Sequence, residues 1–351
     1  MTSITKPRVQ HPANKKNALG KTRREYEGSM STLCAGCGHD SVTAALVEAF
    51  WELDVEPHRV AKMSGIGCSS KTTAYFVGEG YGFNSVHGRM PAVTTGAAAA
   101  NRDLLYVGIS GDGDSLSIGL GQMCHAIRRN VKMLYVLENN GVYGLTKGQF
   151  SASADVGSKA KKGEANIMQP IDPVLLALSL GASFVARSFS GDKAQLIPIL
   201  EAGLKHGGFA LVDVISPCVT FNDHEGSTKS YVYTRQHDRE ITSVDFVPIA
   251  RPIKAEYDDG ERRVVTMHDG SAVALRKIEK DYDPTDRAAA YARVRRAQAE
   301  GEVVTGLLYL DPKTADMHTM NKSAKTPLVN VAFETLCPGK GQLAELMEEY
   351  R

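Results

Sequence analysis

The sequence predicts an α/β protein built on a doubly wound, mostly parallel sheet. Apolar runs at residues 104–109, 132–137 and 209–215 have the composition of strands that are buried on both faces. Between the first two runs, residues 116–127 follow a helical period, and a strand–helix–strand crossover of this length forms a right-handed parallel unit. The loops after such strands meet at one edge of the sheet, where ligands of open α/β sheets bind.

The remaining elements continue this alternation up to about residue 228. We expect a helix at 41–51, a strand at 60–63, a helix at 173–180 ending at Gly181, a strand at 184–189 and a helix at 192–206. Beyond residue 229 the sequence is more charged and less periodic, with turns expected at 258–261 and 267–270 and a charged helix at 287–300 that Gly301 ends. We therefore expect three regions: a basic N-terminal arm (1–28), a catalytic domain (29–228) and a C-terminal extension that contacts other subunits (229–351).

Composition and charge agree with a cytoplasmic enzyme subunit. The chain has 351 residues and is 42% hydrophobic, enough for a large core, and its net charge of +1 argues against a dedicated nucleic-acid-binding protein. We see no apolar run of membrane-spanning length and no apolar signal core at the N-terminus. Residues 1–24 carry lysines and arginines but no acidic residue, which indicates a partly ordered basic arm.

A glycine–aspartate motif follows the first predicted strand, and an asparagine pair follows the second. Mg²⁺ prefers oxygen ligands, and Asp112 with the amide oxygen of Asn140 would supply two of them. Gly111 and Gly113 let the backbone approach a phosphate closely, and the next helix directs its free N–H groups at the anion. The sequence therefore predicts a site for Mg²⁺ and a diphosphate.

Four of the six cysteines lie in loops that contain glycine or proline, as ligands of an iron–sulfur cluster often do. These are Cys34, Cys37, Cys68 and Cys218. The rival interpretation is a four-cysteine zinc site, but zinc ligands usually come as two close pairs and this chain has one C-x-x-C. Cys124 lies inside a predicted helix and is expected to be a buried thiol, and Cys337 is expected to be an ordinary loop cysteine.

The Gly-Asp-Gly motif followed by Asn-Asn resembles the signature of thiamine diphosphate enzymes. With the four cysteines around it, the chain resembles the beta subunit of 2-oxoacid:ferredoxin oxidoreductases over residues 32–224. The resemblance implies the thiamine-diphosphate-binding fold, one [4Fe–4S] cluster on the four cysteines, and Mg²⁺ on Asp112, Asn140 and the Val142 carbonyl. Asp114 would lie near the diphosphate, with helix capping as its structural alternative.

The resemblance also implies further site residues. His87, in His-Gly-Arg, would lie near the diphosphate or the thiazolium, and its alternative role is that of an ordinary loop histidine. Lys71, His87 and Leu145 are the expected catalytic residues. The expected cofactor-binding residues are Gly67, Ser69, His87, Gly88, Gly111, Asp112, Gly113, Asp114, Asn140, Gly144, Leu145 and Thr146.

Lys71 favours 2-oxoglutarate over pyruvate as the substrate. It stands three residues after Cys68, so a loop that holds the cluster also places an ammonium near the reacting carbon. A desolvated lysine suits the second carboxylate of 2-oxoglutarate, which pyruvate lacks, and Leu145 would line the same pocket. The alternatives are a solvated loop lysine and a pyruvate-preferring or broad-range enzyme of the same family.

The reaction implied is the oxidative decarboxylation of 2-oxoglutarate with coenzyme A to succinyl-CoA and CO₂, with electrons passing from the thiamine adduct through the cluster to ferredoxin. No acidic residue can be assigned to activate the thiamine, and in this family an alpha, or fused gamma–alpha, chain supplies that carboxylate within an α₂β₂ assembly. No ferredoxin-like cysteine cluster is present either, so a separate carrier should take the electrons. Two other classes stay open: a redox-inert thiamine decarboxylase or synthase with structural zinc, and a non-catalytic zinc-stapled subunit.

Overall fold

The computed structural model describes residues 4–7, 10–158, 165–224, 227–247, 263–266, 272–277, 282–337 and 339–351. The turns expected at 258–261 and 267–270 lie outside these ranges. Among the described residues, the largest sheet has eight strands in the order β2-β1-β3-β4-β8-β7-β13-β9.

The neighbouring strands β2, β1, β3, β4, β8 and β7 all run parallel, which confirms the predicted fold class. The antiparallel pairing is that of β13 with β7, and β9 then pairs parallel to β13. In chain order the strands of this sheet are β1 (Val60–Ser64), β2 (Tyr81–Asn84), β3 (Leu105–Gly111), β4 (Met133–Asn139), β7 (Phe184–Phe189), β8 (Phe209–Ile215), β9 (Asp238–Glu240) and β13 (Val303–Leu310).

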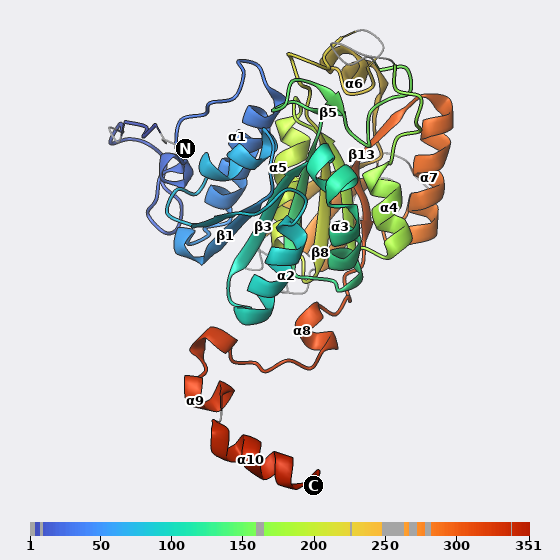
Figure 1. The fold of residues 1–351 in the computed structure, drawn as a ribbon. Coiled ribbons are helices and arrows are strands. Elements are labelled where there is room, and N and C mark those ends of the chain that lie inside the picture. Colours follow the sequence, from blue (N-terminus) through green and yellow to red (C-terminus); the bar gives the residue numbers. More distant parts are fainter. Residues whose placement is uncertain are drawn as a thin grey trace.

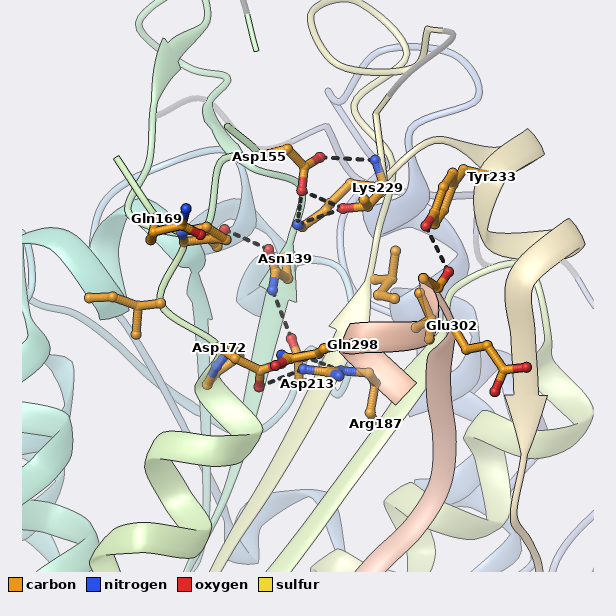
Figure 2. A pocket seen from close by; sticks show the side chains of 18 of the residues that line it. Asn139, Asp155, Gln169, Asp172, Arg187, Asp213, Lys229, Tyr233, Gln298 and Glu302 are labelled. Atoms are coloured by element: carbon orange, nitrogen blue, oxygen red, sulfur yellow. Dashed lines mark hydrogen bonds and ion pairs between the residues drawn. The ribbon is translucent and has the colours of Figure 1, made fainter. Parts of the chain in front are cut away.

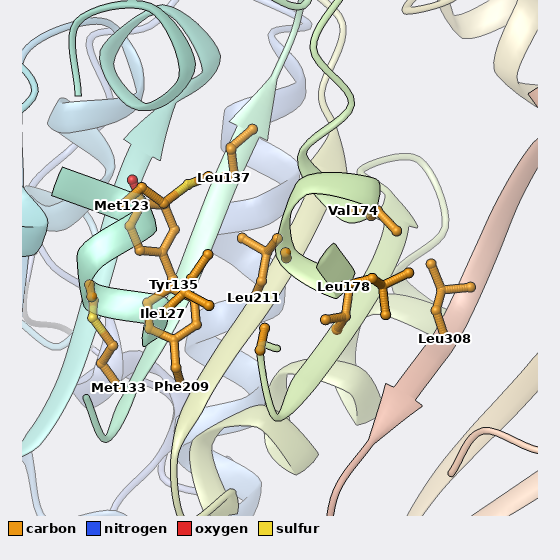
Figure 3. Close-up of a cluster of buried hydrophobic side chains, with 14 of the residues drawn as sticks. Met123, Ile127, Met133, Tyr135, Leu137, Val174, Leu178, Phe209, Leu211 and Leu308 are labelled. Carbon is orange, nitrogen blue, oxygen red and sulfur yellow. The ribbon is translucent and has the colours of Figure 1, made fainter. Parts of the chain in front are cut away.

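Helices cover both faces of this sheet (Figure 1). One buried cluster joins the sheet to α1 (Gly38–Glu52) and α5 (Lys193–Lys205). The other joins it to α2 (Met90–Ala100), α3 (Leu120–Arg128), α4 (Pro173–Leu180) and α7 (Arg287–Glu300). In that second cluster, Tyr135 and Leu211 of the central strands lie between helix residues such as Ile127 and Leu178 (Figure 3).

Smaller elements complete the described chain. A hairpin of β5 (Val142–Tyr143) and β6 (Gln149–Phe150) follows the asparagine pair, and α6 (Tyr231–His237) follows β8. A separate antiparallel sheet contains β10 (Thr242–Val247), β12 (Ala272–Lys277) and β11 (Arg263–Thr266). The single turns are η1 (Arg23–Tyr26), η2 (Pro57–Arg59), η3 (Ser69–Ala74), the π-helical η4 (Gly113–Ile118), α8 (Met317–Met320), η5 (Leu328–Asn330) and α9 (Phe333–Leu336), and α10 (Lys340–Glu348) comes last.

The two predicted glycine stops are confirmed. Gly181 and Gly301 follow α4 and α7 with φ angles of 80° and 74°, in the left-handed region that glycine adopts without steric cost.

The last residues of the segment expected to be a basic arm (1–28) pack against α1. Tyr26 is fully buried in the cluster around α1. The side-chain amide of Asn17 donates to the hydroxyl of Tyr26 and to the carbonyl of Trp51, and the Trp51 indole donates to the carbonyl of Lys21. Burial of the Tyr26 ring and these hydrogen bonds therefore hold the segment against α1, although its composition is basic.

The sheet extends past the boundary expected at residues 228/229. β13 and α7 both lie in the range expected to be an extension, yet Leu307 and Leu308 of β13 are buried in the two main clusters. β13 lies between β7 and β9 and pairs antiparallel with β7, so it does not continue the parallel alternation from which the boundary was predicted.

The last part of the chain leaves the body as an arm, which we define as residues 328–351 (Figure 1). None of its helical turns η5, α9 and α10 has a buried residue. None of the helices that the structure describes is long and apolar enough to cross a membrane.

Candidate functional site

A narrow cavity of about 70 Å³ opens at the edge of the sheet where β3 and β4 end. Most of the predicted site residues come together there. Its lining consists of His39, Ile66, Gly67, Cys68, Ser69, His87, Gly111, Asp112, Gly113, Asp114, Asn140, Val142, Tyr143, Gly144, Leu145 and Thr146. Of the predicted cofactor and substrate residues, all of which are described, Lys71 and Gly88 stand outside the lining.

Asp112 lies at the floor of this cavity with about 1% of its surface exposed. Its Oδ1 accepts the Asn140 backbone N–H at 3.2 Å, and its Oδ2 accepts the Ser153 hydroxyl at 2.9 Å. Burial raises the pKa of the Asp112 carboxyl, although these hydrogen bonds oppose the shift. Both of these donors are uncharged, so a bound cation would supply the positive charge that balances the Asp112 carboxylate.

Asp114 has a different environment, since donors from its own chain surround it. Its Oδ1 accepts the backbone N–H groups of Ile66 at 3.1 Å and Gly88 at 2.6 Å and lies 2.5 Å from Nδ1 of His87. Its Oδ2 accepts the hydroxyl of Ser110 at 2.6 Å. Three of these partners share Oδ1 and one bonds to Oδ2, so both oxygens of the carboxylate are already engaged by the chain. Asp114 therefore ties three loops of the cavity together.

Two glycines of the motif are required by close approach. A Cβ at Gly113 would lie 2.5 Å from Cε1 of Tyr143, whose hydroxyl donates to the Gly113 carbonyl at 3.1 Å. A Cβ at Gly111 would lie 2.8 Å from the hydroxyl of Ser69. The motif glycines thus let the β5 hairpin and the start of η3 close over the end of β3.

The loops of the four predicted cluster cysteines meet beside the cavity. A Cβ at Gly144 would lie 3.5 Å from Sγ of Cys68 and 3.7 Å from Sγ of Cys218. Sγ of Cys34 accepts the hydroxyl of Thr220 at 3.6 Å, two residues beyond Cys218. The backbone N–H of Gly38, next to Cys37, donates to the Pro217 carbonyl at 3.2 Å.

The pKa values of these thiols agree with a shared environment. Burial raises the pKa of Cys37 to about 12 and also raises the pKa values of Cys68 and Cys218. A negative charge on Cys34 adds to the rise at Cys68 and Cys218, so these groups lie within electrostatic range of one another. Within the described ranges, no group of three or more His, Cys, Asp or Glu side chains is placed to hold a single metal ion. Cluster ligands each bind a different iron, so their sulfur atoms stand farther apart than the ligands of one ion.

Lys71 lies in η3, in the turn that follows Cys68, and its ammonium lowers the pKa of the Cys68 thiol against the larger effect of burial. In the part of the chain that the structure describes, its side chain makes no hydrogen bond or ion pair. Leu145 is 47% exposed at the mouth of the cavity, and the Thr146 hydroxyl donates to the Gln149 side chain. Lys71 is thus a half-exposed cation beside the site.

Sequence reasoning missed several residues of this site. His39 lies 3.5 Å from the amide of Asn140 through its Nε2, and Nδ1 makes a 2.6 Å hydrogen bond with Ser216. Its place directly after Cys-Ala-Gly-Cys-Gly was the one available signal, because it follows the predicted cluster loop. Ser153 and the fully buried Glu138 belong to no motif, and only the fold brings them next to Asp112 and His39.

Comparison with known proteins agrees with this geometry. Residues 65–214 match the family model described as thiamine pyrophosphate enzyme, C-terminal TPP binding domain. The 2-oxoacid:ferredoxin oxidoreductase subunit beta of Sulfolobus sp is 38% identical over 239 residues, which cover 68% of this chain and 76% of that protein. This chain belongs to the family of 2-oxoacid:ferredoxin oxidoreductase beta subunits.

Other members of this beta-subunit family carry more specific names. The 2-oxoglutarate oxidoreductase subunit KorB of Mycobacterium tuberculosis is 42% identical over 191 residues, 54% of this chain and 51% of that protein. A solved structure of 2-oxoglutarate:ferredoxin oxidoreductase from Magnetococcus marinus, with 2-oxoglutarate, coenzyme A and succinyl-CoA bound, superposes with a TM-score of 0.71 at 30% identity. That match covers 89% of this chain and 92% of the other, which confirms the predicted family and fold.

Proposed function

We propose that this chain is the beta subunit of a 2-oxoglutarate:ferredoxin oxidoreductase, which converts 2-oxoglutarate and coenzyme A to succinyl-CoA and CO₂. The observation that carries the proposal is the meeting of the Cys68 and Cys218 sulfurs around Gly144, on the wall of the cavity that contains Asp112 and Asn140. A diphosphate and metal site next to a group of thiols is the arrangement that a thiamine enzyme with electron transfer needs. The relatives named for 2-oxoglutarate support the choice of substrate.

The residues at the end of β3 and β4 suit thiamine diphosphate and Mg²⁺. Asp112, the amide of Asn140 and the carbonyl of Val142 form an all-oxygen donor set of the kind Mg²⁺ prefers. Gly111 and Gly113 keep side chains away from the phosphate path, and Asp114 holds the surrounding loops. When bound, thiamine diphosphate supplies the electron sink for decarboxylation. The chain itself positions the substrate and shields the cavity from water.

The four thiols suit a [4Fe–4S] cluster. The raised pKa values of Cys37, Cys68 and Cys218 keep these three thiols protonated in the metal-free chain, so cluster assembly releases protons and turns them into thiolates. The chain offers one such group of cysteines in three separate loops, which favours a cluster over a zinc site built from two close pairs. Electrons would leave through this cluster to a ferredoxin.

We assign Lys71 to the distal carboxylate of the substrate. Its ammonium has no acidic partner among the described residues, and it lies in the turn that places Ser69 on the cavity wall. A carboxylate brought near it would gain a charge-assisted contact that pyruvate has no group to make. Lys71 would therefore set the preference between the two substrates, with Leu145 at the same mouth.

The carboxylate that activates the thiamine is expected from an alpha chain. Among the described residues that line the cavity, the carboxylates are those of Asp112 and Asp114, and each accepts hydrogen bonds from its own chain. Neither is free to act on the aminopyrimidine. The complete enzyme thus requires the partner subunit, and we propose an α₂β₂ assembly.

We also propose that the C-terminal arm binds the alpha chain. In α10 and the turn that follows it, Leu343, Leu346, Met347 and Tyr350 recur at the spacing of one helix face, and each is more than half exposed. Glu345 and Glu348 lie on the opposite face. An amphipathic helix whose apolar face is exposed to water is typical of a helix that binds in a groove of another chain.

Anaerobic purification of the complex tests the proposal. Counts of iron, sulfide and thiamine diphosphate should give a full [4Fe–4S] cluster and one cofactor for each beta chain. The variant Cys218→Ser should lose most of its iron, whereas the matched control Cys124→Ser, at a thiol of α3, should keep it. Zinc in place of iron would support a redox-inert thiamine enzyme instead, and zinc without bound thiamine diphosphate would support the non-catalytic subunit.

A further inference from the structure

A second and larger cavity lies behind the asparagine pair. Its volume is about 710 Å³, and polar and charged side chains from β4, β7, β8 and α7 line it (Figure 2). Two of its lining residues, Asn139 and Ser153, also belong to the surroundings of Asp112. The support of the predicted Mg²⁺ ligand is therefore part of the wall of this cavity.

A chain of buried hydrogen bonds runs along this wall. Nε of Arg187 on β7 donates to Oδ2 of Asp213 on β8 at 2.7 Å, and Nδ2 of Asn139 on β4 donates to Oδ1 of the same carboxylate at 3.1 Å (Figure 2). The Ser153 hydroxyl lies 2.8 Å from Oδ1 of Asn139 and 2.9 Å from Oδ2 of Asp112. The links follow the order of the strands in the sheet, from β7 through β8 and β4 to the end of β3.

The donors in this chain fix its orientation. Arg187 only donates, so Asp213 accepts from it, and the remaining carboxylate oxygen requires the NH₂ group of Asn139. The oxygen of the Asn139 amide must then face Ser153. All of these side chains are at least nine-tenths buried, so water does not compete for the bonds.

We propose that Ser153 is a positioning residue for Asp112, and that Arg187, Asp213 and Asn139 hold Ser153 in place. This inference rests on the proposed function, in which Asp112 binds Mg²⁺. The ion pairs of Arg187 with Asp172 and Asp213 hold the start of α4 against the sheet, so they have a structural role of their own. They do not require a hydroxyl at residue 153, whose one hydrogen lies within reach of two acceptors, Oδ1 of Asn139 and Oδ2 of Asp112. Ser153 keeps that carboxylate turned in one direction before the metal arrives.

The test measures metal binding on the purified complex, with Mn²⁺ as the probe in the presence of thiamine diphosphate and with free Mn²⁺ followed by EPR. Ser153→Ala should raise the Kd for Mn²⁺ by about tenfold or more, as expected for the loss of one hydrogen bond to a charged group. The apparent KM for thiamine diphosphate should rise with it. Ser153→Thr, which keeps the hydroxyl, should restore most of the affinity. The control Ser179→Ala removes an exposed hydroxyl that bonds to a carbonyl of its own helix α4 and should stay within about twofold of the native Kd.

The outcomes separate this inference from the proposed function. If the native complex binds no Mn²⁺ with thiamine diphosphate, the proposed function fails. If the native complex binds it and Ser153→Ala has the native Kd, the positioning role fails. If Ser153 has only a structural role, Ser153→Ala would instead lower the number of Mn²⁺ sites and the melting temperature of the complex without changing the Kd. That result would also overturn the positioning role. Should Ser153→Ala not assemble, Asp213→Asn serves in the same titration, because its amide cannot accept from both Arg187 and Asn139, and a native Kd there overturns the inference.

Discussion

Replacing Asp114 by asparagine tests whether this residue holds the loops of the site together. The carboxylate accepts from the backbones of Ile66 and Gly88, from the hydroxyl of Ser110 and pairs with His87, and it is only about 3% exposed. Asparagine has the same shape. Its oxygen can take the place of Oδ1 and keep three of the partners, while its NH₂ group faces the hydroxyl of Ser110.

The expected cost follows from the loss of charge. Hydrogen bonds to a charged group contribute about 1.5–3 kcal/mol each and neutral ones about 0.5–1.5 kcal/mol, so each retained bond weakens by about 1 kcal/mol. Three such bonds predict that Asp114→Asn lowers the free energy of unfolding by about 3 kcal/mol. That is a large part of the 5–15 kcal/mol typical of a folded protein.

Urea unfolding measures this difference. Trp51 is the only tryptophan in the sequence and is 7% exposed in α1, so its fluorescence reports on this chain. The matched control is Asp192→Asn, which makes the same change at the N-cap of α5, where asparagine caps as well as aspartate, and it should cost less than about 0.5 kcal/mol. If Asp114→Asn costs no more than this control, Asp114 is not the residue that holds the loops.

Four further outcomes are expected. Lys71→Ala should raise the apparent KM for 2-oxoglutarate about tenfold but that for pyruvate less than twofold, and equal effects on both would remove Lys71 from substrate recognition. Gly113→Ala should destabilise the chain by about 1–3 kcal/mol because its Cβ would meet the Tyr143 ring, and Tyr143→Leu should recover part of that loss in the same urea assay. Burial lowers the pKa of His39 to about 4, so the unfolded chain binds a proton more readily than the folded chain between about pH 6.5 and 4. Stability should therefore fall by about 3 kcal/mol across that window as pH is lowered, and His39→Gln, compared with the native chain by urea unfolding at each pH, should lack this contribution. Deletion of residues 339–351 should leave the melting temperature of the chain nearly unchanged but weaken binding to the alpha chain in a pull-down, and undiminished binding would contradict the role proposed for the arm.

The sequence was sufficient for the central strands and the motif at their ends. Residues 184–189 and 209–215 were predicted as strands with the bounds that the structure gives, because a strand buried on both faces needs a continuous apolar run that is visible locally. Asp112 and Asn140 were placed together for a similar reason, since the right-handed crossover leaves one arrangement for two loops that follow adjacent parallel strands.

Some elements were not predicted from the sequence. β13 joins the sheet through residues far along the chain, and Tyr26 enters the core from a segment whose composition is basic. The helix after Asp112 begins as a π-helical turn before α3, which an apolar period near 3.6 does not distinguish from a regular start. In each case, contacts distant in sequence decide the structure.

The family of this chain and the residue types of its site were therefore determined by the sequence alone, through motifs whose spacing is short. The tertiary structure decided what each polar group is bonded to. Asp112 and Asp114 are two residues apart and chemically identical, yet one opens into the cavity beside Asn140 and the other is enclosed by donors of its own chain. Ser153 belongs to no motif and still contacts Asp112. Hydrogen bonds of this kind depend on positions fixed to within a few tenths of an ångström by the whole packed sheet, and such positions are not encoded in any single segment.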